Sequence, residues 1–481
     1  MPQLQQVLDH AWKLQQSGDP ATAESIYRQV LTQLPQNAPA HVYLGISLFD
    51  QRRFAESVES YRRALAIQQQ FPIAWNNLGN SLRMLGEIEE ADRCLQTATS
   101  QKPDYLSPLK NRGTLWIWAG EVDRGLHWYH EALKLAPHDP ELHRNLGVIY
   151  LLQERYAEGW PEYRWRWSFI EGGRPTDRYP VWQGQEPAGK TFLLYPEQGL
   201  GDAIQFIRVA SILKAAGAKT IVRCAAHLVP LFQSAPGIDS LLPEGMPMSE
   251  QIDYQASFLD VVDHWFGRTG ELATGGGELD LANGYLSVSP SLIDYWRRVL
   301  QPRDPSEHDH SERGQPERGP GQRRVGLCWQ GNPKHHADVY RSLKLSEFAQ
   351  IASNPAVSLV NLQHGFGVEQ LTQVPFGHRI QRPAGTLDQS GGAFLDTAAI
   401  MRNLDLVITT DTSTAHLAAA LGVPVWVILG RVPDWRWLQH GETTPWYPTM
   451  RLFRQTQIGD WSSVISEINR RLTDAEAARA M

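Results

Sequence analysis

Acidic, hydroxyl and basic side chains follow apolar, strand-like stretches at several points in the chain. One such segment is YPEQGLGDAIQF (195–206), where Gly199 and Gly201 predict a tight turn and a helix is expected to begin at Asp202. Gly201 would let a ligand approach the backbone, and a helix N-terminus favours negative charge. Asp202 is then either a general base facing a bound ligand or a simple helix cap. Ile204 stands where a dinucleotide-binding fingerprint requires glycine.

A second segment, TTDTSTAHLAAALG (409–422), combines a strand end with a hydroxyl-rich helix start. The helix is expected to open with four polar residues: Asp411, Thr412, Ser413 and Thr414. Hydroxyl groups and free N–H groups at a helix start form a cradle for phosphate. His416 lies about one turn further and can reach the same anion. The alternative is a well-capped helix with a satisfied core histidine, but three hydroxyl residues exceed what capping needs.

Basic residues gather in a third segment, WQGNPKHHADVYRSL (329–343), which also follows a strand. They are Lys334, His335, His336 and Arg341. Such a loop can neutralise a diphosphate, or it can be a solvated surface loop. The His pair with Asp338 could suggest a metal, but no further ligand set is evident, so we expect none.

Aromatic residues mark a fourth segment (431–455). Its large rings, which can stack on a base or sugar or can cover the end of a sheet, are Trp435, Trp437, Trp446 and Tyr447. Covering is the more frequent use of any single buried ring. Gln363 and His364, at the end of the strand expected at 357–363, are candidate contacts for a ring or ribose.

The elements that position these loops alternate between strands and helices from Thr191 onward. Strands are expected at 191–196, 220–225, 238–242, 252–256, 323–329, 357–363, 405–410 and 424–430. Helices are expected between them at 201–217, 227–235, 346–353, 396–404 and 412–421, and last at 461–472. This alternation is typical of parallel, doubly wound sheets. Two Rossmann-like halves facing a cleft are therefore predicted, with ligands beyond the carboxyl ends of the strands.

The N-terminal third follows another pattern, because four glycines recur at intervals of 34 residues. They are Gly45, Gly79, Gly113 and Gly147. That period is typical of the tetratricopeptide repeat and predicts an all-α solenoid of about five helix pairs. Large apolar residues keep the same step at Tyr27, Tyr61, Leu95, Tyr129 and Tyr163. A solenoid presents a concave surface that usually holds a protein or peptide.

The domain boundaries follow from these patterns. We expect repeats at 1–170, a linker at 171–190, an N-terminal Rossmann-like half at 191–300, a mobile insertion at 301–322 and a C-terminal half at 323–475. The insertion contains no aliphatic or aromatic residue and cannot bury a core.

Composition narrows the functional classes. The net charge of −7 gives no reason to expect nucleic acid as a partner, and no apolar run is long enough for a membrane span. Three scattered cysteines and the lack of an apolar N-terminal signal favour a cytoplasmic protein. Of 17 tryptophans, several near residue 165 form either a packed junction or an aromatic platform for an acceptor.

Taken together, GLGDAIQF, WQGNPKHHADVYRSL, DTSTAHLAAALGVPVW and PDWRWL with PWYPTMRLFRQ resemble bacterial glycosyltransferases that carry tetratricopeptide repeats. The catalytic half is similar to the ADP-heptose:lipopolysaccharide heptosyltransferase family, and the layout also looks like protein O-GlcNAc transferases. The resemblance implies a GT-B fold, a nucleotide-diphosphate sugar donor, inversion at the anomeric carbon and no essential metal or other cofactor.

The resemblance also implies residue roles. The family's base corresponds to Asp202, and its donor-phosphate helix corresponds to Asp411, Thr412, Ser413, Thr414 and His416. Its basic loop residue corresponds to Lys334 or Arg341, which the resemblance does not separate. Nucleotide-sugar contacts are thus expected at Gly201, Lys334, Arg341, Gln363, Asp411, Thr412, Ser413, Thr414 and His416. The expected activity is glycosyl transfer to a protein or peptide held by the repeats. The rivals are a non-catalytic scaffold with a relic nucleotide-binding domain and a nucleotide-sugar epimerase.

Overall fold

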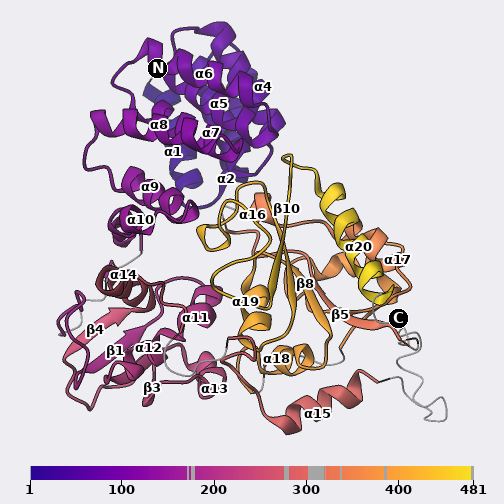
Figure 1. The fold of residues 1–481 in the computed structure, drawn as a ribbon. Coiled ribbons are helices and arrows are strands. Elements are labelled where there is room, and N and C mark those ends of the chain that lie inside the picture. Colours follow the sequence, from indigo (N-terminus) through magenta and orange to yellow (C-terminus); the bar gives the residue numbers. More distant parts are fainter. Residues whose placement is uncertain are drawn as a thin grey trace. The chain divides into compact units, whose positions relative to one another are not determined.

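The computed structural model describes residues 2–170, 173–174, 179–275, 281–301, 319, 321–335, 338–383, 387–389 and 391–477. Most of the expected insertion, 302–318 and 320, lies outside these residues, as does His336. The chain forms two compact units (Figure 1). We call them the repeat unit (Met1–Tyr150 with Pro161–Ser168) and the sheet unit (Leu151–Trp160 with Phe169–Met481).

Helices in pairs build the repeat unit and run on into residues 151–160. They are α1 (Pro2–Gln16), α2 (Pro20–Gln33), α3 (Ala38–Asp50), α4 (Phe54–Ile67), α5 (Pro72–Leu85), α6 (Ile88–Gln101), α7 (Leu106–Trp118), α8 (Val122–Leu135), α9 (Pro140–Leu152) and α10 (Tyr156–Tyr163), followed by the 3-10 turn η1 (Arg164–Ser168). Side chains cap some of them: the Asp19 carboxylate accepts from Thr22 N–H at 3.1 Å, and Asn37 Oδ1 from Ala40 N–H at 2.9 Å. The all-α solenoid predicted from the repeat spacing is confirmed.

The repeated glycines mark the closest approach within each helix pair. A Cβ on Gly45 would lie 2.6 Å from Tyr61, and one on Gly113 would lie 2.3 Å from Tyr129. Both rings are buried, with 1% and 3% of their surface exposed. Each glycine thus faces the large side chain that keeps the same period, because a close-packed interior leaves no room there for a methyl group.

Two parallel sheets form the centre of the sheet unit. The four-stranded sheet has the order β3-β2-β1-β4 and contains β1 (Thr191–Tyr195), β2 (Lys219–Cys224), β3 (Ser240–Pro243) and β4 (Tyr254–Ser257). The six-stranded sheet has the order β10-β9-β8-β5-β6-β7 and contains β5 (Arg323–Cys328), β6 (Val357–Asn361), β7 (Ile380–Gln381), β8 (Leu406–Thr410), β9 (Val425–Leu429) and β10 (Met450–Arg454). Strands covered on both faces need continuous apolar runs, which explains sequences such as LVITT and VWVIL.

Helices cover both faces of the larger sheet (Figure 1). On one side, α17 (Ala349–Ser353) and α20 (Trp461–Ala477) share a core with alternate strand residues such as Leu406 and Ile408. On the other side lie α18 (Leu395–Met401) and α19 (Ser413–Ala420).

Several elements differ from those expected. The helix predicted at 201–217 is two helices, α11 (Leu200–Phe206) and α12 (Val209–Ala215). The aromatic segment 431–455 is not all loop, because its end forms the edge strand β10. Sequence reasoning also missed β7, α14 (Phe258–Thr269) and α15 (Pro290–Val299). Within the expected linker, Trp182 is fully buried against Phe192 and donates its backbone N–H to Gln255 O at 2.9 Å.

No helix among the residues that the structure describes has the length and apolarity needed to cross a bilayer.

Candidate functional site

The start of α11 brings the predicted base loop against the predicted phosphate helix, because α11 and α19 lie side by side (Figure 1). A Cβ on Gly201 would lie 2.8 Å from His416 Cδ2 and 3.5 Å from Ser413 Cα. Only a glycine allows this approach, so Gly201 lets α11 pack directly against α19, and the space beside it is filled by His416 rather than open to a ligand.

Asp202 lies within the first turn of its helix and does not begin it. The helix begins at Leu200 with Gly199 as its N-cap residue, and Asp202 Oδ2 accepts the Gly199 N–H at 3.1 Å. Asp202 is therefore not the N-cap residue expected from the sequence; it is the third residue of the helix, and one of its carboxylate oxygens binds the N–H of the N-cap Gly199. The other oxygen is bound by the Arg436 guanidinium.

Arg436 connects two carboxylates beneath this loop. It donates to Asp202 Oδ1 and, at 2.7 Å, to Asp434 Oδ1, and only 6% of its side chain is exposed. Its guanidinium also lies over the Trp435 ring, 4.5 Å from the centroid. Burial raises the pKa of Asp202 above its usual value, and Asp434 and Glu197 act in the same direction, whereas Arg436 opposes them.

The hydroxyl groups at the start of α19 differ in the hydrogen bonds that they make within the protein. Thr412 is the N-cap residue and makes no capping hydrogen bond, and its hydroxyl lies 3.2 Å from Thr409 Oγ1. Thr414 Oγ1 points back to Cys328 Sγ at 3.6 Å. The N-terminus of α19 is thus not closed by the N-cap side chain, which leaves the arrangement expected of an anion-binding helix start.

Asp411, just before α19, is an unusual acid. Burial raises its pKa to about 6, and Asp434 adds to the rise, while Arg341 and Arg436 oppose it. The Arg341 charge thus affects Asp411, the residue just before the phosphate helix. Arg341 Nε also lies 3.6 Å from Asp338 Oδ1. By contrast, Lys334 is exposed, and its backbone N–H is held by Asn332 Oδ1 at 2.9 Å. The Arg341 charge thus lowers the pKa of Asp411, whereas Lys334 is not among the groups that act on this carboxyl.

His416 is buried, with 5% of its surface exposed, and stacks on Trp437 with 5.1 Å between ring centroids. Its Nδ1 lies 3.1 Å from Tyr447 Oη. Burial and the nearby cations Arg436, Arg208 and Arg341 hold its pKa well below the usual value. The imidazole is therefore neutral near pH 7 and serves as a packed hydrogen-bonding group.

Gln363 holds a loop in place. Its Oε1 accepts the backbone N–H groups of Trp329 at 3.0 Å and Gln330 at 2.9 Å. Its Nε2 donates to the carbonyls of Gln330 at 2.9 Å and Phe366 at 2.7 Å. These bonds tie the loop after β5 to the loop after β6, and they already engage both ends of the Gln363 amide.

The aromatic rings of segment 431–455 cover the sheet rather than offering a platform. Their exposed fractions do not exceed 1% at Trp435, Trp437, Trp446 and Tyr447. Trp160 is equally buried, with its ring centroid 5.5 Å from that of Trp435.

Two cations in this region were missed from the sequence. Arg436 stands between two tryptophans in a strand-end loop, and that neighbourhood was the available signal. Arg208, between α11 and α12, is fully buried; it donates to Trp446 O at 2.7 Å and lies 4.8 Å from the centre of the Tyr447 ring. No feature of the sequence around Arg208 predicts that this side chain is buried.

Comparisons with known proteins identify the repeats. The Tetratricopeptide repeat family matches residues 8–72, 45–92 and 119–163. Protein FlbA of Caulobacter vibrioides is 26% identical over 482 residues, which span 95% of this chain and 76% of that protein. The probable UDP-N-acetylglucosamine–peptide N-acetylglucosaminyltransferase SPINDLY of Hordeum vulgare is 28% identical over 137 residues, or 27% of this chain and 14% of the relative.

Among solved structures, a thermophilic TPR protein of Thermus thermophilus is 21% identical, with a TM-score of 0.32, over 36% of this chain and 92% of its own. The family match shows that the N-terminal part of this chain is built from tetratricopeptide repeats. Those repeats are similar to the repeats of a relative named as a glycosyltransferase.

Proposed function

We propose that the chain is an inverting, metal-independent glycosyltransferase of GT-B architecture, which takes its sugar from a nucleotide-diphosphate donor. The observation that carries the proposal is the contact between the loop after β1 and the start of α19. This contact sets the helix that carries Asp202 beside the start of α19, where the N-cap side chain makes no capping hydrogen bond and the Arg341 charge acts on the adjacent Asp411. A general base, a phosphate cradle and a cation are the groups that such a transfer requires.

The reaction would proceed by a single displacement. An acceptor hydroxyl or amide attacks the anomeric carbon and gives its proton to Asp202. The bond from that carbon to the diphosphate oxygen breaks, and its electron pair leaves with the nucleoside diphosphate. N–H groups at residues 412–414 and the Arg341 guanidinium stabilise the charge on the leaving group, each such donor contributing about 3 kcal/mol.

The acceptor would be a protein or peptide bound by the repeat unit. Solenoids of this kind present extended surfaces suited to polypeptides. The alternative is a non-catalytic scaffold that retains the nucleotide site as a relic. The epimerase alternative is less favoured, since an epimerase has no use for an acceptor-binding solenoid.

A thermal-shift panel tests the donor site. UDP-, GDP-, ADP-, CMP- and dTDP-sugars are added without metal to the full chain and to the variants Thr412→Ala and Arg341→Ala, with Lys334→Ala as the matched loop control. A ligand that binds the folded state raises Tm with the logarithm of its excess. We expect one nucleotide to raise Tm in the parent and in Lys334→Ala, and to lose this effect in the other two variants. No shift with any donor would favour the scaffold.

A further inference from the structure

In the ligand-free chain, both oxygens of the Asp202 carboxylate are already engaged. Oδ2 accepts the Gly199 N–H, and Oδ1 accepts from Arg436, which also binds Asp434. Each oxygen keeps a second lone pair, so these bonds do not block protonation, but the Arg436 cation on Oδ1 holds down the basicity of the carboxylate. Loosening the contact between Asp202 and Arg436 would therefore make Asp202 a stronger base for the proposed reaction.

Contacts on both sides of Arg436 place it near the phosphate helix. Arg436 binds Asp202, and its neighbour Trp437 stacks on His416 of α19 with 5.1 Å between ring centroids. Its charge also lowers the pKa of Asp411 and of His416. Gly201, next to Asp202, meets Ser413 at the start of α19. A diphosphate at that helix start would compete with Asp202 for the same guanidinium, and Arg side chains bind phosphate in paired hydrogen bonds.

We propose that Arg436 is a positioning residue shared between the base and the donor: it holds Asp202 while the site is empty, and a bound diphosphate draws it away, which makes Asp202 a stronger base for the acceptor's proton. The inference rests on the proposed function and adds an order of events, donor first and acceptor second.

The exchange is a matter of charge balance. One guanidinium binds Asp202 and Asp434, and the charge of a third carboxylate, Glu197, also raises the pKa of Asp202. A diphosphate brings further negative charge and takes the cation. Asp202, without its counter-ion, then binds a proton more tightly and becomes a stronger base. Because coupling is reciprocal, removal of the Asp202 charge must strengthen diphosphate binding.

Calorimetric titration with UDP, GDP and ADP measures this coupling without turnover. The full chain is compared with Asp202→Asn, Arg436→Gln and Arg436→Lys. Asp239→Asn is the control for net charge, since Asp239 pairs with Lys214 at 2.6 Å near the start of β2. We expect Asp202→Asn to bind the preferred nucleotide about fivefold more tightly, Arg436→Gln to bind it about fivefold more weakly, and the control to match the parent.

Equal affinity in the parent, Asp202→Asn and Arg436→Gln would overturn the shared role while leaving the donor site intact. Absence of binding in the parent would instead refute the donor site itself, and the inference with it. A pH profile of kcat/KM gives a second readout: in Arg436→Gln the acidic limb moves to higher pH, and Arg436→Lys moves it back toward the parent. A merely structural Arg436 would lower the rate without moving the limb.

Discussion

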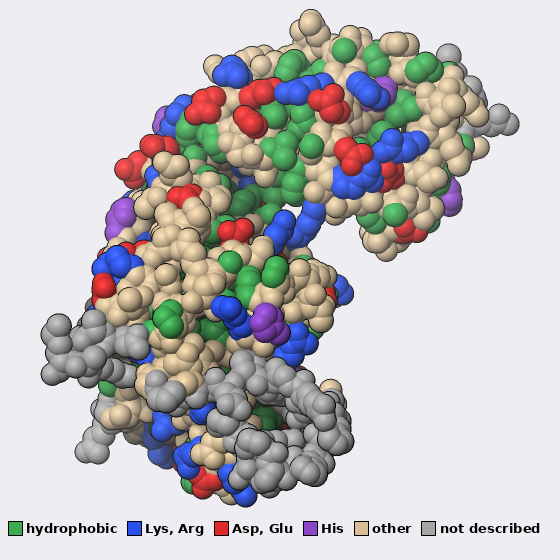
Figure 2. Space-filling view, turned by 90° about the vertical axis from the view of Figure 1, so that its right-hand side faces the viewer, with side chains coloured by type: hydrophobic (Ala, Val, Ile, Leu, Met, Phe, Trp, Pro, Cys, Tyr) green, Lys and Arg blue, Asp and Glu red, His purple; other side chains and the backbone are tan. Residues whose placement is uncertain are grey.

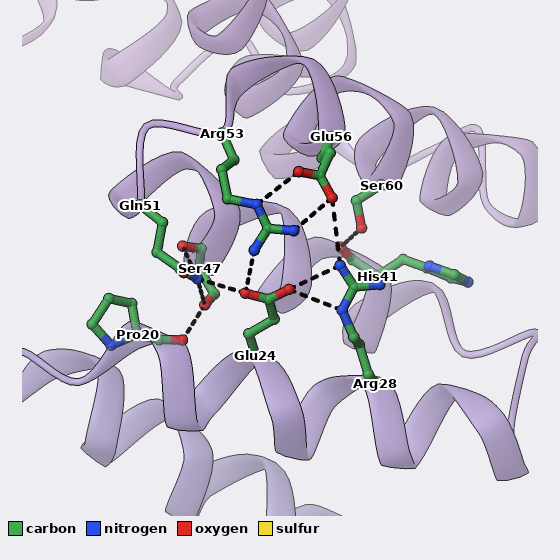
Figure 3. A network of polar contacts seen from close by, with 9 residues as sticks. All are labelled: Pro20, Glu24, Arg28, His41, Ser47, Gln51, Arg53, Glu56 and Ser60. Carbon is green, nitrogen blue, oxygen red and sulfur yellow. Dashed lines mark hydrogen bonds and ion pairs between the residues drawn. The ribbon is translucent and has the colours of Figure 1, made fainter. Parts of the chain in front are cut away.

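Each unit of the molecule contains a cluster in which arginine binds two carboxylates, and the clusters differ in how far water reaches them. In the repeat unit, Arg53 binds Glu24 at 2.7 Å and Glu56 at 2.6 Å, and Gln51 adds a bond to Glu24 at 2.8 Å (Figure 3). In the sheet unit, Arg436 binds Asp202 and Asp434. The Arg53 side chain is 37% exposed and that of Arg436 is 6% exposed.

This difference in exposure determines how strongly the charges of each cluster affect stability and the pKa values of nearby groups. Exposed pairs contribute about 0–1 kcal/mol to stability, because water screens them and their side chains must be ordered. Acidic and basic side chains of the repeat unit mix over the face that Figure 2 displays, with hydrophobic side chains between them. Water screens a buried charge much less, so a buried charge shifts the pKa values of the titratable groups around it more strongly. Arg436 therefore changes the pKa values of the groups around it, whereas Arg53 joins α2 to the turn before α4.

The largest effect is expected at Asp202. Asp202→Asn should lower kcat by about 10²–10⁴-fold, the usual contribution of a general base, because the amide cannot take the acceptor's proton. Donor affinity should not fall. The measurement is sugar transfer to an acceptor under saturating donor, with binding titrated in parallel. A loss of affinity that matched the loss of rate would argue against a base.

The next prediction compares the two arginines directly. Arg436→Gln should lower the free energy of unfolding by about 3 kcal/mol, because it leaves Asp202 and Asp434 without their buried cation. Arg53→Gln should lower it by about 1 kcal/mol or less. Urea unfolding of both variants and the parent gives the two values. Equal losses would remove the distinction drawn between the clusters.

Asp411, whose pKa responds to Arg436, and Glu24, which binds Arg53, should make stability respond to pH with opposite signs. Burial raises the folded-state pKa of Asp411 to about 6, so its ionisation opposes folding, and stability from this group is lost as pH rises from about 4 to 6. For Glu24, burial raises the pKa, but bonds from Gln51 and Arg53 outweigh burial and lower it overall. Glu24 therefore contributes stability that is present above its unfolded pKa and is lost as pH falls.

Paired variants separate these signs. Relative to the parent, Asp411→Asn should gain stability between pH 4 and 6.5, by roughly 2–3 kcal/mol, since one pKa unit corresponds to about 1.4 kcal/mol. Glu24→Gln should lose stability relative to the parent as pH rises to about 4.5, because the Glu24 contribution is complete above its unfolded pKa. Urea unfolding from about pH 3.5 to 6.5 measures both slopes, and slopes of the same sign would contradict the assignment.

The sequence predicted the repeat unit in detail and the sheet unit in part, for a physical reason. In a solenoid, contacts join neighbouring repeats, so the spacing of Gly45 and Tyr61 in one repeat recurs in the others and reveals the packing. In the sheet unit the loops after β1, β5 and β8 could be predicted, because glycine, acid and hydroxyl residues follow apolar runs.

What could not be predicted depends on residues far apart in the chain. Asp202 and Arg436 are separated by 234 residues, and Arg208 and Trp446 by 238. No local pattern distinguishes a buried arginine from an exposed one. The break between α11 and α12 was missed for a similar reason, because an apolar run gives no sign that Arg208 O accepts from Ser211 Oγ at 2.6 Å.

The smallest effect is expected within the repeat cluster itself. Glu56 has 53% of its side chain exposed, whereas Glu24 has 12%. Glu56→Gln leaves Arg53 bound to Glu24, so the urea midpoint should stay within error of the parent, and added salt should not change that result. Glu24→Gln is the matched variant and should lower the midpoint measurably, because it removes the partner that joins α2 to the turn before α4. A larger loss at Glu56 than at Glu24 would mean that charge number, not burial, governs this cluster, and the contrast with Arg436 would then need another explanation.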